Sequence, residues 1–171
     1  MPADTLVASY APRASAPLYT PEERARRDAS PWTVVQGVLA AVQFLVFLAS
    51  LVLVVRCLVT GAGVWAANAS VVAKTVTLYT IMVTGAVWEK DVFGQYLFAR
   101  PFFWEDVVSM GVIGLHTAYV ALLWRGAPVR TLMLVALVAY AAYALNAAQF
   151  VWKLRRARLD AATAGLPAGA P

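Results

Sequence analysis

Four apolar segments, each long enough to cross a lipid bilayer, constrain the fold of this chain more than any other feature. They cover approximately residues 32–55, 66–88, 104–124 and 131–152. A helix rises about 1.5 Å per residue, so each segment matches a hydrocarbon core of roughly 30 Å. Hydrophobic residues make up 61% of the chain and charged residues 13%, whereas soluble domains have about 45–50% and about 25%. The sequence therefore predicts an all-α, integral membrane four-helix bundle.

A charged segment, TPEERARRDASPW, precedes the first span and carries the start signals of a short helix. Thr20 can cap this helix, and Glu23 completes a capping box with it. We expect the helix to lie at the membrane surface. The two ends of the chain, residues 1–18 and 160–171, are expected to be disordered tails. Residues 19–159 then form a single membrane domain.

Basic residues indicate the orientation of the bundle. With four spans, both termini share a side with the loop between the second and third spans. Ten Lys and Arg residues lie on that side and four on the other, so the positive-inside rule makes it cytoplasmic. The net charge of +5 is explained in this way. Nucleic-acid binding is not expected, because no basic stripe with interleaved aromatic residues is present.

One cysteine and one histidine narrow the chemistry. A lone Cys57 excludes an intramolecular disulfide and a multi-cysteine metal site, and a lone His116 excludes a bis-histidine haem within one chain. Glu105, Ser109, His116 and Tyr119 share one face of the third span, because eleven residues make about three helical turns. His116 can be a hydrogen-bonded core residue, a proton-transfer group or an axial ligand to the metal of a planar pigment.

Four of the nine carboxylates gather at the cytoplasmic ends of the second and third spans, and these are Glu89, Asp91, Glu105 and Asp106. Two structural explanations exist: the helix dipole favours anions in the first turn of the third span, and Lys90 or Arg100 can pair with some of the acids. The functional interpretation is that some of these carboxyl groups transfer protons. Carboxyl groups half inside an apolar environment hold their protons more firmly and can serve as general acids near neutral pH.

Aromatic and polar residues surround these acids. Trp88, Tyr96 and Trp104 would suit a flat hydrophobic ligand, and they would suit membrane-interface anchoring equally well. Lys74 either snorkels to the far interface or is a cation deep in the bundle. Further polar residues should point inward and join the helices; among these are Gln36, Gln43, Tyr140, Tyr143 and Asn146. The residues alone thus predict an acid-lined aromatic pocket facing the cytoplasm, without identifying a reaction.

Three blocks of the sequence, LYTPEERARRDASPWTVVQG, KTVTLYTIMVTGAVWEKDVFGQYLFA and FFWEDVVSM, resemble the 3-vinyl (bacterio)chlorophyllide hydratase family, whose older name is 2-vinyl bacteriochlorophyllide hydratase. The resemblance covers roughly residues 18–159. It implies a hydro-lyase of the bacterial inner membrane that adds water to the C3 vinyl group of chlorophyllide a or 3-vinyl bacteriochlorophyllide. No separate cofactor is implied, because hydration changes no net oxidation state and the substrate carries its own Mg. Other bacteriochlorophyll biosynthesis enzymes are candidate partners.

Such a hydration needs an acid for the terminal vinyl carbon, a base for the attacking water and an apolar slot for the macrocycle. We expect Glu89 or Glu105 to be the acid and Asp91 or Asp106 to hold the water. His116 is an alternative acid or base, or a ligand to the substrate Mg. The expected substrate-binding residues are Trp88, Tyr96, Trp104, Ser109, Tyr119 and Lys74. The alternative class is a non-catalytic pigment-binding or assembly protein with four spans. A proton-coupled transporter is disfavoured, because the carboxylates gather at one face.

Overall fold

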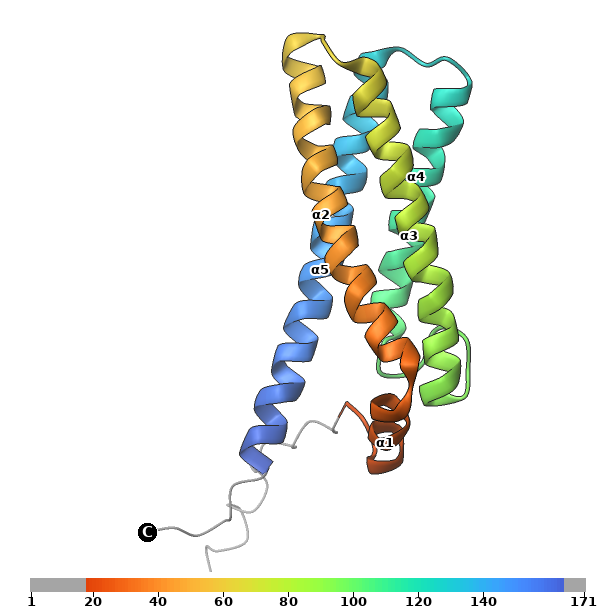
Figure 1. Ribbon diagram of the computed structural model, residues 1–171, viewed down its shortest axis with the longest axis vertical. Helices are drawn as coiled ribbons and strands as arrows, with labels where there is room; N and C mark the ends of the chain where they lie inside the picture. Colours follow the sequence, from red (N-terminus) through yellow and green to blue (C-terminus); the bar gives the residue numbers. More distant parts are fainter. Residues whose placement is uncertain (1–17, 165–171) are drawn as a thin grey trace, which may run out of the picture.

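The computed structural model describes residues 18–164, and all of their regular secondary structure is helical. Residues 1–17 and 165–171 of the predicted tails lie outside the described residues, whereas residues 160–164, predicted to be disordered, belong to the last helix. Five helices follow one another along the chain (Figure 1): α1 (Pro21–Ala29), α2 (Pro31–Thr60), α3 (Val64–Phe93), α4 (Phe103–Trp124) and α5 (Val129–Ala164). The last four are long and apolar enough to cross a membrane. The predicted four-helix membrane bundle with a short N-terminal helix is thus confirmed for the described part of the chain.

Helix α1 forms for the reason that its sequence predicts. The Thr20 hydroxyl accepts a hydrogen bond from the Glu23 backbone N–H at 3.2 Å, and the Glu23 carboxylate accepts one from the Thr20 N–H at 2.8 Å. The Arg26 guanidinium donates to the Val92 carbonyl at 2.7 Å. This bond ties α1 to the C-terminal end of α3, beneath the bundle (Figure 1). Its position at a membrane surface stays a prediction.

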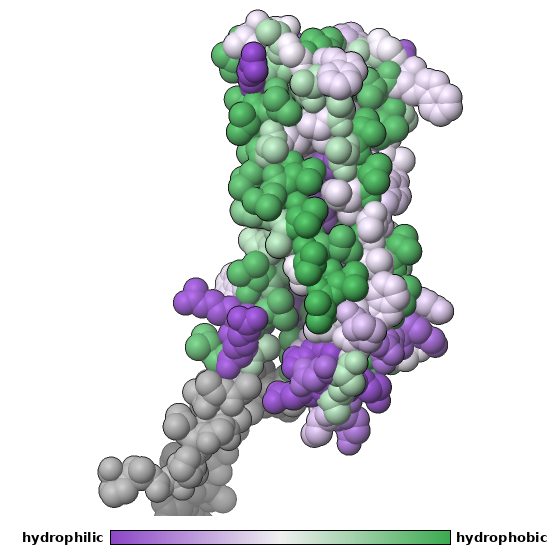
Figure 2. Space-filling view, in the orientation of Figure 1, coloured by the Kyte–Doolittle hydropathy of each residue, from purple (hydrophilic) through white to green (hydrophobic). Residues whose placement is uncertain are grey.

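The four long helices pack as two pairs, α2 with α3 and α4 with α5, and α2 also crosses α5 (Figure 1). Small and branched side chains fill the space between them, including Val54, Ala67, Val71 and Ala136. Apolar side chains also cover much of the visible face along the length of the bundle, while hydrophilic ones gather at the end that carries α1 (Figure 2). Exposed apolar surface of this extent is stable in lipid and not in water, so the structure is that of a multi-pass membrane protein.

Three helices are longer than their apolar stretches predict. Helix α2 continues to Thr60 and ends at Gly61, and α3 continues to Phe93 and ends at Gly94. Both glycines have a positive φ, which closes a helix at little cost. Helix α5 passes the predicted boundary at residue 159 and reaches Ala164. Backbone hydrogen bonding continues past the apolar stretch, because charged residues are also good helix formers. The predicted loop after the second span is therefore shorter, at residues 94–102.

Candidate active site

The carboxyl groups of Glu89 and Asp106 come together at the end of the bundle that carries α1 and residues 94–102, called here the loop end. Glu89 lies near the C-terminal end of α3 and Asp106 near the N-terminal end of α4, and they are only 4% and 5% exposed. Their side chains lie within hydrogen-bonding reach of each other. A hydrogen bond between two carboxyl groups needs one proton on the pair, and two adjacent negative charges repel strongly. We call these two residues the acid pair.

The loop between α3 and α4 supplies a backbone donor to each member of the acid pair. The Ala99 N–H donates to Glu89 Oε2 at 3.1 Å, and the Phe98 N–H donates to Asp106 Oδ2 at 2.8 Å. Phe98 has a φ of 59°, a left-handed conformation that is costly for a residue with a side chain. The bonds to the two acids stabilise this conformation, and the acids in turn are covered by the loop.

Glu105, the third buried acid at the loop end, pairs with α5. The Lys153 ammonium donates to Glu105 Oε2 at 2.6 Å and lies 5.0 Å from the ring centre of Phe102. Phe102 stacks on Phe150 of α5 with ring centres 6.0 Å apart. Glu105 is therefore the anion of an ion pair that holds α5 against α4 and the loop. This leaves the acid pair as the better source of a transferable proton.

Asp91 is not brought to the other acids. It is exposed on α3, two residues after Glu89, and two residues turn about 200° around a helix. Of the two residues predicted to hold water, only Asp106 lies beside a second carboxyl group.

The aromatic residues at the loop end divide into a packed set and an exposed set. Trp88 packs against Phe93 and Phe102, with ring centres 5.7 and 5.6 Å apart. In contrast, Tyr96 and Trp104 are 61% and 70% exposed. The predicted aromatic pocket is thus filled by its own side chains. The exposed rings at the loop end are those of Tyr96, Phe98, Phe103 and Trp104, called here the exposed aromatic surface. Within it, the Phe103 ring contacts Phe98 and Trp104, with ring centres 5.8 and 5.4 Å apart.

Lys74 belongs to a different group of polar residues, deep between the helices. It is fully buried, so the interpretation in which it snorkels to the far interface is wrong. Its ammonium donates to Gln43 Oε1 and lies 3.5 Å from the ring centre of Tyr143. Fifteen residues of α3 separate Lys74 from Glu89, which is about 22 Å along the helix. The two side chains therefore cannot act on the same atom.

His116 and Tyr119 also lie deep in the bundle, and both are fully buried. His116 Nδ1 bonds to the Val112 carbonyl at 2.9 Å, which places the proton on Nδ1 and the lone pair on Nε2. Nε2 has no hydrogen-bond partner among the described residues. The Tyr119 hydroxyl donates to Asn68 at 2.8 Å. The predicted roles of both residues stay predictions.

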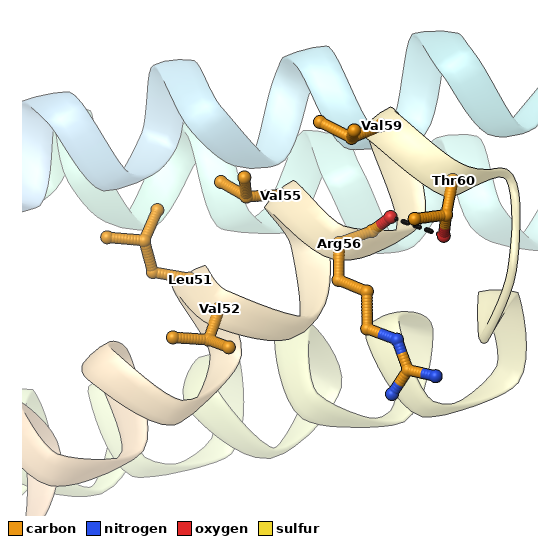
Figure 3. Close-up of a pocket in the computed structure, with 6 residues that line it drawn as sticks. All are labelled: Leu51, Val52, Val55, Arg56, Val59 and Thr60. Atoms are coloured by element: carbon orange, nitrogen blue, oxygen red, sulfur yellow. Dashed lines mark hydrogen bonds between the residues drawn. The ribbon is translucent and has the colours of Figure 1, made fainter.

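Two hollows in the described surface lie away from the acids. The first is on α2, where Arg56 and four apolar side chains lie along its outer face (Figure 3). The Arg56 side chain points away from those apolar residues, and its carbonyl accepts a hydrogen bond from the Thr60 hydroxyl at 2.7 Å (Figure 3). The second lies on α3 and α4 around Tyr79 and Thr117. Neither hollow borders the acid pair.

Two partners of the loop-end residues were not assigned to the site from the sequence. Asn146 was predicted only to face inward, but its Nδ2 donates to Ser109 Oγ at 2.8 Å. Lys153 was counted only toward membrane orientation, yet it binds Glu105. Their spacing of seven residues, two helical turns, is a signal that they share one face of α5. It does not reveal which face of α4 they meet.

The fold and these contacts define a class: a multi-pass membrane protein with a buried pair of acids at one end of its bundle. The family model of 2-vinyl bacteriochlorophyllide hydratase (BCHF) matches residues 19–156. The 2-vinyl bacteriochlorophyllide hydratase of Rhodobacter capsulatus is 66% identical over 146 residues, 85% of this chain and 85% of that protein. The one of Cereibacter sphaeroides is 65% identical over 143 residues, 84% of this chain and 89% of that protein. No solved structure matches. The chain belongs to the 2-vinyl bacteriochlorophyllide hydratase family.

Proposed function

We propose that this chain is a hydro-lyase that adds water to the vinyl group of bacteriochlorophyllide or chlorophyllide a and leaves a 1-hydroxyethyl group. Two relatives that are 66% and 65% identical over 146 and 143 aligned residues carry the name 2-vinyl bacteriochlorophyllide hydratase. The structural observation that carries the proposal is the acid pair, since hydration requires one group that gives a proton and one that takes it.

The proton of the acid pair should rest on Glu89. Glu89 lies near the C-terminal end of α3, where the helix dipole disfavours a negative charge. Asp106 lies in the first turn of α4, where the dipole favours one. We therefore assign Glu89 as the proton donor and Asp106 as the carboxylate.

This assignment accounts for every proton that moves during one turnover. Glu89 gives its proton to the terminal vinyl carbon, and the cation on the adjacent carbon is delocalised into the macrocycle. A water attacks that carbon, and Asp106 takes the proton that the water loses. The proton shared by the pair then returns to Glu89. One turnover forms one C–H bond and one C–O bond, and the pair ends with one proton as it began.

The macrocycle would bind from the membrane side of the loop end. We place it on the exposed aromatic surface, of which Trp104 directly precedes Glu105 and Asp106 in sequence. Aromatic rings and lipid together provide the apolar contact that a flat pigment needs. The Mg belongs to the substrate, and the proposed chemistry uses no additional cofactor.

The loop end is proposed to face the cytoplasm across the bacterial inner membrane. Both ends of the described chain, α1 and the end of α5, lie at the loop end (Figure 1). Basic residues are more frequent there than at the opposite end. Those at the loop end are Arg24, Arg26, Arg27, Lys90, Arg100, Lys153, Arg155, Arg156 and Arg158, and those at the other end are Arg56, Arg125 and Arg130.

Two conservative substitutions test the assignment. Glu89→Gln removes the donated proton, and Asp106→Asn removes the base, while each keeps the size of the side chain. We expect each to lower turnover by about 100-fold or more. The assay follows loss of the vinyl absorption of chlorophyllide a by the purified protein in lipid nanodiscs, with the hydroxyethyl product identified by chromatography. Glu22→Gln, the same change at an exposed position of α1, is the matched control.

Turnover of Glu89→Gln within a few-fold of the unmodified protein would exclude Glu89 as the acid. Asp91→Asn decides between the two predicted water holders, and near-normal turnover is expected because Asp91 faces away from the pair. Pigment binding without conversion by the unmodified protein would instead indicate the non-catalytic pigment-binding class.

A further inference from the structure

The side chain of Asn146 has an unused hydrogen-bond acceptor inside the bundle. Asn146 lies on α5 and is 8% exposed. Its Nδ2 donates to Ser109 Oγ on α4 at 2.8 Å, but its Oδ1 has no partner among the described residues. Contact between α4 and α5 explains the bond made by the nitrogen. It does not explain why Asn146 Oδ1 is buried without a hydrogen-bond donor, which costs free energy.

Ser109 connects Asn146 to the face of α4 that carries Asp106, one member of the acid pair. Ser109 is three residues after Asp106 and four after Glu105, so it shares a helix face with both acids. Side chains at this spacing have Cβ atoms about 5–6 Å apart. A water molecule that bridges two oxygens spans about 5.5 Å, which is twice an ordinary O–H···O distance of about 2.8 Å. This spacing is on the scale that one bridging water spans, and we therefore place a water between the Asp106 carboxylate and the group formed by Ser109 and Asn146.

We propose that Asn146 Oδ1 holds the water that Asp106 activates, and that Ser109 orients the Asn146 amide for this task. The proposal rests on the proposed hydration of the vinyl group. A water has two hydrogens, and attack on a carbon uses its oxygen lone pair. One hydrogen points to Asp106, which takes that proton, and the other points to Asn146. The lone pair is then directed at the carbon that carries the positive charge, and the product keeps the hydrogen bound to Asn146.

A variant that loses this acceptor should fail at one step only. In Asn146→Leu, Glu89 still protonates the vinyl group, but capture of the cation by water is slower. The cation then returns to the vinyl form more often by losing a proton from its methyl group. In D2O that methyl group carries one deuteron, so the recovered substrate gains deuterium. We expect hydration to fall by about 10-fold, the scale of one hydrogen bond, while deuterium in unreacted substrate rises relative to product.

The experiment measures hydration and deuterium content of recovered chlorophyllide a with the full-length protein in nanodiscs. Gln149→Leu, which removes an amide from an exposed position of the same helix, is the matched control and should leave both values unchanged. Ser109→Ala should show a smaller change in the same direction as Asn146→Leu, and it carries the test if Asn146→Leu does not fold.

The outcomes separate this inference from the proposed function. Unchanged hydration in Asn146→Leu overturns the inference and leaves the acid pair untouched. A parallel fall of hydration and deuterium exchange in both the Asn146 and Ser109 variants also overturns it, since it shows that the contact only joins helices. Glu89→Gln should suppress both hydration and exchange, and their persistence would overturn the proposed function itself.

Discussion

Replacing Gln43 with Leu removes the oxygen that accepts the hydrogen bond of the buried Lys74 ammonium. The ammonium then keeps only the ring of Tyr143, 3.5 Å from its nitrogen, and it has no access to solvent. Hydrogen bonds to charged groups contribute about 1.5–3 kcal/mol, whereas interhelical polar contacts in a membrane bundle average about 0.6 kcal/mol. We expect Gln43→Leu to lower the free energy of unfolding by about 2 kcal/mol.

A double-mutant cycle isolates this contribution. Lys74→Met removes the charge and keeps a long apolar side chain, so its own effect should be small, because a buried charge is replaced by packed apolar volume. In the Lys74→Met background, Gln43→Leu should change stability by less than about 0.6 kcal/mol, the average of an ordinary interhelical contact. The coupling energy is then the difference between the two effects, about 1.4–2 kcal/mol. Reversible unfolding in mixed micelles, followed by helical circular dichroism, measures all four proteins.

A coupling below about 0.6 kcal/mol would refute the view that Gln43 stabilises a buried charge. The same proteins test whether the buried Lys74 is functionally separate from the acid pair. Since about 22 Å of helix lies between Lys74 and Glu89, Lys74→Met should retain vinyl hydration within a few-fold per folded molecule. A loss of 10-fold or more at unchanged stability would show that Lys74 does bind the substrate, as its sequence position predicts.

Two further predictions concern Lys153 and His116. Lys153→Met leaves the largely buried Glu105 without its cation and should lower stability by about 1–2 kcal/mol, between the values for exposed and buried ion pairs; adding Glu105→Gln should recover most of this loss in the same unfolding assay. Unchanged stability of Lys153→Met would show that the Lys153–Glu105 ion pair does not hold α5 in place. His116→Ala should leave the absorption spectrum of bound chlorophyllide a unchanged, because His116 is enclosed by the bundle; a shifted band would identify it as a ligand to the substrate Mg.

Local sequence patterns were sufficient for the elements of the fold. The four spans follow from apolar length, which is a property of consecutive residues. The start of α1 follows from Thr20 and Glu23, whose bonds close within one helical turn. The resemblance of three blocks, WEKDVF and FFWED included, correctly predicted the family. The helix ends were less accurate, because α3 continues past Glu89 and Asp91 before Gly94 ends it.

The site could be predicted only as a set of residue types at one end of the bundle. Glu89 and Asp91 are equivalent in sequence, each an acid next to Lys90, and only the rotation of α3 decides that Glu89 faces α4. Lys74 could extend outward or inward, and the position of Gln43 on a neighbouring helix decides that it is buried.

Lys153 and Asn146 meet Glu105 and Ser109 across more than thirty residues of chain. These pairings depend on helix rotation and crossing angle, which the combined packing of whole helices sets. No short stretch of sequence contains that information. The sequence therefore determined which segments form the membrane-spanning helices, whereas the tertiary structure decided which acids lie beside each other.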